Sequence, residues 1–354
     1  MAFAGSVTTG VLPTRRVLFS PSGDILVFLY TNGIVKTWNI VTSAPEWTTS
    51  LDHRECFDIC FSPDGRFVAV RSPEKLFLLD AKSGSVLRQT SLGGPDSAGL
   101  AWSPNGIIAT GEPDGRILFF AAEDLGPVGH LEHGFCPQGI LALEFSPDGD
   151  WLISGGKGEG NVAISVVPAG VLADRAFTRA TPYQRGSILD FAFRPNMHQV
   201  ASASADGTII VFHLDNGSIV TQLEGHTSAV VHVAFSFDGR LLVSRAHDGT
   251  VIVWSTESWE VVLRFHHFPP HTPNPVFSPR AHLLVLPTST GIGVELISLD
   301  VDVLLHRPST QQTLHTMTAK VVLLGEGGAG KSCLALRLAQ DQYLEQPPTH
   351  AMRF

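Results

Sequence analysis

A short phrase recurs seven times along this chain and constrains its fold more than any other feature. Each copy is an apolar run ending in an aromatic residue, followed by a small polar residue, usually by proline, and by a turn that usually contains glycine. The residues that follow the aromatic position are 42, 41, 43, 48, 42 and 42 positions apart: Ser20, Ser62, Ser103, Ser146, Arg194, Ser236 and Ser278. A period of this length indicates stacked copies of one small structural unit.

Each copy has the pattern of several short strands joined by turns. In the sixth copy, Val231, Val233 and Phe235 alternate with other residues, which is typical of a strand buried on one face. The Ser-Pro-Asp-Gly phrase of other copies has turn chemistry, because proline fixes φ and glycine accepts positive φ. A second apolar run, an Asp-Gly hairpin turn and a third run ending on an aromatic residue follow. With a more polar outer segment such as 217–221, each copy predicts a four-stranded sheet.

The repeat resembles that of the WD-repeat family, and seven copies imply an all-β, seven-bladed β-propeller over residues 1–306. In that family a structural tetrad links a loop histidine, a strand serine or threonine, a turn aspartate and a tryptophan across one blade. The sixth copy matches in full, with His226, Ser244, Asp248 and Trp254. The resemblance therefore gives these residues a bracing role. The third and fifth copies have phenylalanine in place of tryptophan, and the second, fourth and seventh lack the Asp-Gly turn.

A propeller has to close its ring, because an unpaired edge strand invites aggregation. We expect a segment around Ser6–Val11 to complete the last sheet beside strands from residues 283–299. Closure by Val301–Leu305 is the alternative. The one long spacing, 48, marks an insertion near 167–186, which is either a longer loop or a partner-binding loop on a rigid scaffold.

The composition changes after the repeats. Residues 307–318 are polar, and we interpret them as a linker. An apolar run over 319–324 then precedes a match to G-x-x-x-x-G-K-[ST], whose backbone N–H groups cradle phosphate at a helix N-terminus. Lys331 would place its cation on the β- and γ-phosphates, and the Ser332 hydroxyl would bind Mg²⁺. The predicted phosphate-binding residues are Gly325, Glu326, Gly327, Gly328, Ala329, Gly330, Lys331, Ser332 and Cys333.

Residues 319–354 resemble the start of a Ras-like small GTPase domain, which implies GTP and Mg²⁺ as cofactors. The resemblance places Thr349 where that family's first switch carries a Mg²⁺-sensing threonine, although a plain loop threonine is the alternative. One strand, one loop and one helix of an α/β fold bury too little surface to fold alone. We therefore expect a domain truncated relative to a longer parent protein, which hydrolyses nothing and binds nucleotide weakly or not at all. The preference for guanine over adenine comes from the resemblance alone.

Composition excludes several classes of partner. The net charge of −9 argues against a nucleic-acid surface, and no apolar run approaches the ~18–20 residues of a membrane helix. Four scattered cysteines, Cys56, Cys60, Cys136 and Cys333, fit no disulfide framework in a chain of 354 residues and predict a cytoplasmic protein.

The sequence favours a protein–protein interaction scaffold, with the nucleotide domain of the parent protein as a switch. The alternative is a GTP-binding and GTP-hydrolysing regulatory protein to which the propeller is attached as a regulatory domain. Catalysis inside the propeller channel is a third hypothesis. We disfavour it because the sequence shows no cluster of acid, base or metal-binding residues at equivalent positions of the repeats.

Overall fold

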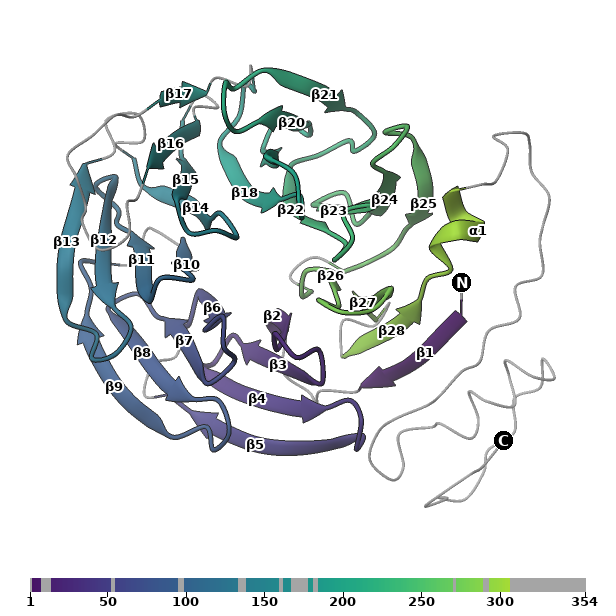
Figure 1. Ribbon diagram of the computed structural model, residues 1–354. Helices are drawn as coiled ribbons and strands as arrows, with labels where there is room; N and C mark the ends of the chain where they lie inside the picture. The colour runs from purple at the N-terminus through teal and green to yellow at the C-terminus, as the bar shows by residue number, and fades with distance from the viewer. Residues whose placement is uncertain are drawn as a thin grey trace, which may run out of the picture.

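The computed structural model describes residues 2–7, 14–51, 55–94, 99–132, 138–158, 162–166, 178–180, 184–269, 272–288 and 293–305. Within these residues the strands pair into seven four-stranded antiparallel sheets that stand side by side in a ring (Figure 1). The predicted all-β propeller, built of four-stranded sheets, is confirmed.

We number the sheets along the chain and name their strands from the ring centre outward. Sheet 1 contains β2 (Thr14–Phe19), β3 (Ile25–Tyr30), β4 (Ile34–Asn39) and β5 (Ala44–Ser50). Sheet 2 contains β6 (Asp58–Phe61), β7 (Phe67–Arg71), β8 (Lys75–Asp80) and β9 (Val86–Ser91). Sheet 3 contains β10 (Leu100–Trp102), β11 (Ile107–Gly111), β12 (Arg116–Ala121) and β13 (Pro127–Glu132). Sheet 4 contains β14 (Ile140–Phe145), β15 (Trp151–Gly156), β16 (Val162–Val166) and β17 (Thr178–Ala180).

The remaining sheets follow the same order, except that the last one takes its outer strand from the start of the chain. Sheet 5 contains β18 (Ile188–Phe193), β19 (Gln199–Ser204), β20 (Ile209–His213) and β21 (Ile219–Leu223). Sheet 6 contains β22 (Val230–Phe235), β23 (Leu241–Ala246), β24 (Val251–Ser255) and β25 (Val261–Phe265). Sheet 7 contains β26 (Val276–Phe277), β27 (Leu283–Pro287), β28 (Val294–Ser298) and β1 (Ala2–Val7).

The hydrophobic core lies between neighbouring sheets. Most of the buried apolar residues lie on the second and third strands of the sheets, and every residue of β19, β23 and β24 is buried. One apolar cluster joins sheet 5 to sheet 6 and includes Val211, Leu242 and Trp254. Outer strands such as β9 are mostly exposed. Strands such as β3 and β24 therefore read as near-continuous apolar runs, because both of their faces are removed from water.

The Ser-Pro turns form as their chemistry predicts. In sheet 2 the Ser62 hydroxyl donates to Asp64 Oδ1 at 2.6 Å, and the N–H of Phe67 donates back to Ser62 Oγ at 2.9 Å. Gly65 completes the turn with φ of +73°, a conformation that residues with a Cβ rarely adopt. Each such turn joins the innermost strand of a sheet to the second strand, so these turns surround one mouth of the ring.

The ring closes through the N-terminal strand. β1 pairs antiparallel with β28, from Ala2 opposite Ser298 to Val7 opposite Val294. An N-terminal strand in the last sheet is confirmed, but it begins before the expected Ser6–Val11, and residues 8–13 lie outside the described part.

The alternative closure by Val301–Leu305 is wrong, because this segment forms the short helix α1. Its Val301 and Leu304 are buried in the apolar cluster of sheets 6 and 7, and the N–H of Val303 donates to Asp300 Oδ1 at 3.1 Å. Burial of that apolar face, together with the Asp300 cap, favours the helix over an edge strand.

Three of the predicted segments are described in part or not at all. Within the insertion near 167–186, residues 178–180 form β17 and residues 184–186 are described, whereas 167–177 and 181–183 lie outside the described part. The linker 307–318 and the segment 319–354 also lie outside the described residues.

Candidate functional site

The four residues assigned to a tetrad in sheet 6 lie together. Ser244 on β23 stands at the centre: its Oγ is 2.7 Å from His226 Nε2 and accepts the indole N–H of Trp254 at 2.8 Å. His226 precedes β22, and its Nδ1 is 3.7 Å from Asp248 Oδ2 in the turn between β23 and β24. The arrangement ties a loop, a turn and two strands of one sheet together.

The sequence analysis missed a fifth member of this network, Thr250. Its hydroxyl is 2.8 Å from His226 Nδ1 and donates to Asp248 Oδ1 at 2.5 Å. The backbone N–H of Thr227 donates to the other oxygen, Asp248 Oδ2, at 2.8 Å. Thr250 therefore bridges the histidine and the aspartate, which lie too far apart for a direct hydrogen bond.

The environment keeps this histidine neutral and this aspartate ionised. Burial lowers the pKa of His226 to about 4. Burial opposes ionisation of Asp248, but the hydrogen bonds from Thr250 and from the Thr227 N–H outweigh it and lower the pKa of this carboxyl to about 2. The His226 side chain is 1% exposed and both of its ring nitrogens are engaged inside the sheet. The pair therefore braces the sheet and offers no base to a substrate.

Sheet 5 carries a related network built on glutamine. Gln184 precedes Ser202 by 18 residues, as His226 precedes Ser244. Ser202 Oγ donates to Gln184 Oε1 at 2.8 Å, and the Gln184 amide donates to the Thr208 carbonyl at 3.1 Å. The signal that could have found it is this spacing, together with the Asp-Gly-Thr phrase that sheets 5 and 6 share.

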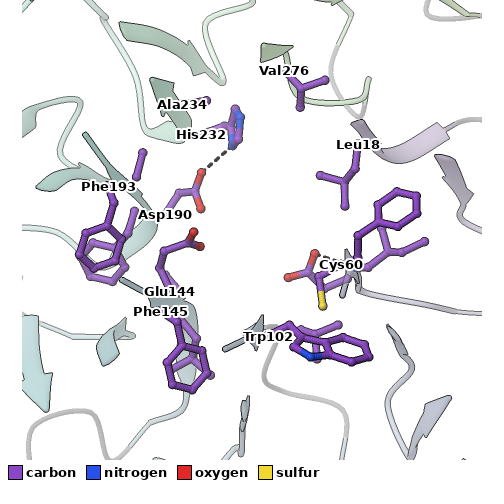
Figure 2. A pocket seen from close by; sticks show the side chains of 18 of the residues that line it. Leu18, Cys60, Trp102, Glu144, Phe145, Asp190, Phe193, His232, Ala234 and Val276 are labelled. Atoms are coloured by element: carbon purple, nitrogen blue, oxygen red, sulfur yellow. Dashed lines mark hydrogen bonds and ion pairs between the residues drawn. The ribbon is translucent and has the colours of Figure 1, made fainter. Parts of the chain in front are cut away.

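A second set of polar residues lies at the centre of the ring. A channel of about 560 Å³, which we call the axial channel, is lined by residues from the innermost strand of every one of the seven sheets. In most repeats, the positions one and three residues before the aromatic residue supply much of its wall, because residues two apart on a strand share a face. Figure 2 shows side chains from these positions facing one space.

The two positions form two layers with different chemistry. The charged layer, three residues before the aromatic position, contains Arg16, Asp58, Asp190 and His232. The apolar layer, one residue before it, contains Leu18, Cys60, Ala192, Ala234 and Val276. Glu144 from β14 stands at the level of the apolar layer.

The charged layer is organised as two pairs. Arg16 Nε lies 3.1 Å from Asp58 Oδ1, and the N–H of Ile59 donates to the same oxygen at 2.9 Å. His232 Nδ1 lies 2.5 Å from Asp190 Oδ2, shown as a dashed line in Figure 2. The other ring nitrogen, Nε2, is 2.8 Å from the carbonyl oxygen of Pro275.

The two pairs differ in what contacts the carboxyl group. Arg16 places its permanent positive charge against Asp58. In the second pair, Asp190 Oδ2 contacts the His232 ring and also accepts the backbone N–H of Val233 at 3.1 Å, while Nε2 of His232 donates to the carbonyl of Pro275.

Glu144 is different, because no hydrogen bond or ion pair holds its carboxyl group among the described residues. It is half-buried, and the pKa of its carboxyl is raised to about 8, first by burial and then by the charges of Asp190 and Asp58. Burial also raises the pKa of the neighbouring Cys60 thiol well above its ordinary value, so this sulfur stays protonated and unreactive.

The interpretation that the repeats place no acid–base cluster at equivalent positions was wrong. Arg16, Asp58, Asp190 and His232 all stand three residues before the aromatic position of their repeats. This shared offset from the aromatic position was the sequence signal that could have revealed these four residues as a group. In the described part of the chain no three or more histidine, cysteine, aspartate or glutamate side chains are grouped to hold a metal ion.

Comparison with known proteins fits this architecture. The family model described as WD domain, G-beta repeat matches residues 127–163, 179–213 and 217–255. Each match begins on or next to the outer strand of one sheet and continues into the next sheet. The chain is a β-propeller of the WD type.

Curated relatives of this WD-type propeller include proteins from a plant, a virus and an animal. The chain is 29% identical over 211 residues to the WD repeat-containing protein VIP3 of Arabidopsis thaliana, covering 57% of the chain and 62% of that protein. It is 29% identical over 171 residues to a putative BTB/POZ domain and WD-repeat protein, R61, of Acanthamoeba polyphaga mimivirus, covering 46% and 31%. It is 33% identical over 105 residues to telomerase Cajal body protein 1 of Mus musculus, covering 30% and 20%. These matches span less than two thirds of the length of each relative.

The other predicted site lies outside the described residues. This holds for the phosphate-binding residues 325–333 and for both predicted Mg²⁺ ligands, Ser332 and Thr349. The three WD matches end before this segment. Separately, the described residues include no helix with the length and apolar character needed to cross a bilayer.

Proposed function

We propose that this chain is a protein-interaction scaffold in which the propeller presents its faces and loops to a protein partner. The observation that carries the proposal is the WD-type ring itself, because propellers of this type generally bind proteins. Interior residues such as Val243 and Val253 are 0% exposed, so the frame that positions the loops is densely packed. Binding residues tend to lie on loops that such a scaffold holds in place.

Cross-linking of the full-length chain in a cell extract tests this proposal. Lys36, Lys75 and Lys82 report on sheets 1 and 2, whereas Lys320 and Lys331 report on the C-terminal segment. We expect a retained partner to cross-link to the propeller. Charge reversal at the contacted loop should then release the partner without changing the melting temperature of the chain. A partner that cross-links only to the two C-terminal lysines would contradict the proposal.

We further infer a nucleotide-binding function for residues 325–333, from their match to G-x-x-x-x-G-K-[ST]. Lys331 and the loop N–H groups would hold phosphate, and Ser332 with Thr349 would bind Mg²⁺. This segment would act as a GTP-dependent switch. The alternative hypothesis is that GTP binding and hydrolysis are the main activity and that the propeller is the regulatory domain.

Titration of the full-length chain with fluorescent guanine and adenine nucleotides in Mg²⁺ tests this second proposal. We expect weak binding, with a dissociation constant above the micromolar range, and no hydrolysis. Lys331→Ala should weaken binding by about 10-fold or more, because it removes a charge-assisted contact to phosphate. Equal binding by the native chain and by Lys331→Ala would contradict the proposal.

A further inference from the structure

We propose that the axial channel binds a basic side chain, lysine or arginine, of a protein partner, with the Glu144 carboxylate as its counter-ion. The inference rests on the scaffold function proposed above and names the chemistry of the partner at one position.

The charge balance of the channel supports a cationic occupant. Asp58 contacts Arg16, and Asp190 contacts the His232 ring and accepts the backbone N–H of Val233, so each of these two carboxyl groups already has partners. Glu144 is the remaining acid, and no described side chain or backbone group binds its carboxyl group. An ionised carboxylate on a partly desolvated wall is costly without a positive partner. An incoming ammonium or guanidinium group would supply that partner.

The channel is accessible from the face that carries the Ser-Pro turns. Its lining includes the prolines of four of these turns, namely Pro21, Pro104, Pro147 and Pro279. Glu144 lies two residues before Ser146, the first residue of its turn, which places it about 7 Å inside the mouth at the usual rise of a strand. A protein seated on the Ser-Pro turns could therefore reach Glu144 with one long side chain.

The wall around Glu144 suits the stem of such a side chain. Leu18, Ala234 and Val276 stand at the same level and are apolar, and Trp102 also lines the channel (Figure 2). Lysine and arginine bury an aliphatic stem along apolar surface while the charged head finds a polar partner. The indole of Trp102 adds an aromatic surface of the kind that attracts cations. An acidic side chain would find no positive partner in Glu144.

The raised pKa of Glu144 makes cation binding depend on pH. The groups that face it in the channel are Arg16, Asp58, Asp190, His232 and Cys60. Below pH 8 the empty channel holds Glu144 largely protonated, since its pKa is about 8. A cation favours the ionised form, so binding at pH 7 should release up to about one proton, and affinity should rise as pH approaches 8.

Calorimetry on the full-length chain with short peptides tests the inference. The probes are acetylated, amidated pentapeptides with lysine, arginine or glutamine at the centre of four glycines, and cadaverine as a free amine. At pH 7 we expect the two basic peptides to bind and the glutamine peptide not to bind. Repeating the titration in buffers of different ionisation enthalpy should show proton release by the native chain.

Two variants separate Glu144 from other carboxyl groups. Glu144→Gln keeps the size of the side chain and should weaken binding of the lysine peptide by about 10-fold or more and abolish proton release. Glu295→Gln is the matched control, because Glu295 on β28 is also half-buried with a pKa raised by burial but lies outside the channel. It should bind like the native chain.

The outcomes distinguish this inference from the scaffold proposal. If Glu144→Gln binds the lysine peptide as the native chain does, the channel site is wrong, even when a partner still cross-links to the propeller. If cadaverine binds as tightly as the lysine peptide, the site takes free amines and the assignment to a protein side chain is overturned. Loss of a cross-linked partner in Glu144→Gln, with its retention in Glu295→Gln, would support both.

Discussion

At the scale of single residues, His226 shows how burial converts an ionisable group into a structural one. Its ring nitrogens face Ser244 and Thr250, and its side chain is almost completely enclosed. Protonation would force a charged ring into a site that already satisfies both nitrogens. The neutral ring is therefore the form that the fold stabilises, and acid should weaken the sheet that contains it.

We expect the stability of the chain to fall as the pH drops from about 6.5 to about 4. In this window the unfolded histidine, with its pKa near 6.5, binds a proton that folded His226, with its pKa of about 4, does not bind. Acid therefore stabilises the unfolded state relative to the folded state, by up to about 3 kcal/mol through this one histidine. Denaturant unfolding at pH 7 and at pH 4.5 measures the difference.

His226→Gln is the control, because Gln184 shows that glutamine fits the equivalent place in sheet 5. The variant has no group that titrates at this position. Its loss of stability between the two pH values should be smaller than that of the native chain. An equal loss in both proteins would show that His226 does not carry the effect.

At the scale of strands and turns, local chemistry made much of the fold predictable. Proline, aspartate and glycine specify the turn between the first and second strands of a sheet, as the Ser62 and Asp64 hydrogen bond illustrates. The helix α1 was not predictable in this way, because burial of Val301 and Leu304 depends on sheets 6 and 7 being already assembled.

The axial channel was the part of the candidate site that local reasoning could not assemble. Arg16 and His232 are more than 200 positions apart in the sequence, and only the closed ring brings them to one cavity. A charged residue within an apolar strand looks like an isolated exception until equivalent positions of all the repeats are compared. The tetrad of sheet 6 was easier, because its residues lie within 30 positions of one another.

At the scale of the whole molecule, closure depends on one strand from the start of the chain. Removal of residues 2–7 should leave β28 as an unpaired edge and expose backbone groups that β1 now pairs. We expect a loss of stability on the order of 3 kcal/mol and concentration-dependent association of the truncated chain. Denaturant unfolding and light scattering after size-exclusion chromatography measure the two effects.

The variant Ser6→Thr keeps the backbone pairing of β1 and should behave like the native chain. A truncated chain that stays monomeric with an unchanged unfolding midpoint would show that β1 is dispensable.

The pairing of β1 with β28 also determines how early the ring can close during synthesis. About 290 residues separate the two strands, and a ribosome takes on the order of 15–60 s to translate this stretch. Throughout that interval the first strand has no place to dock, while the earlier sheets are free to form beside it. The circle therefore cannot be sealed until nearly the entire propeller has been translated.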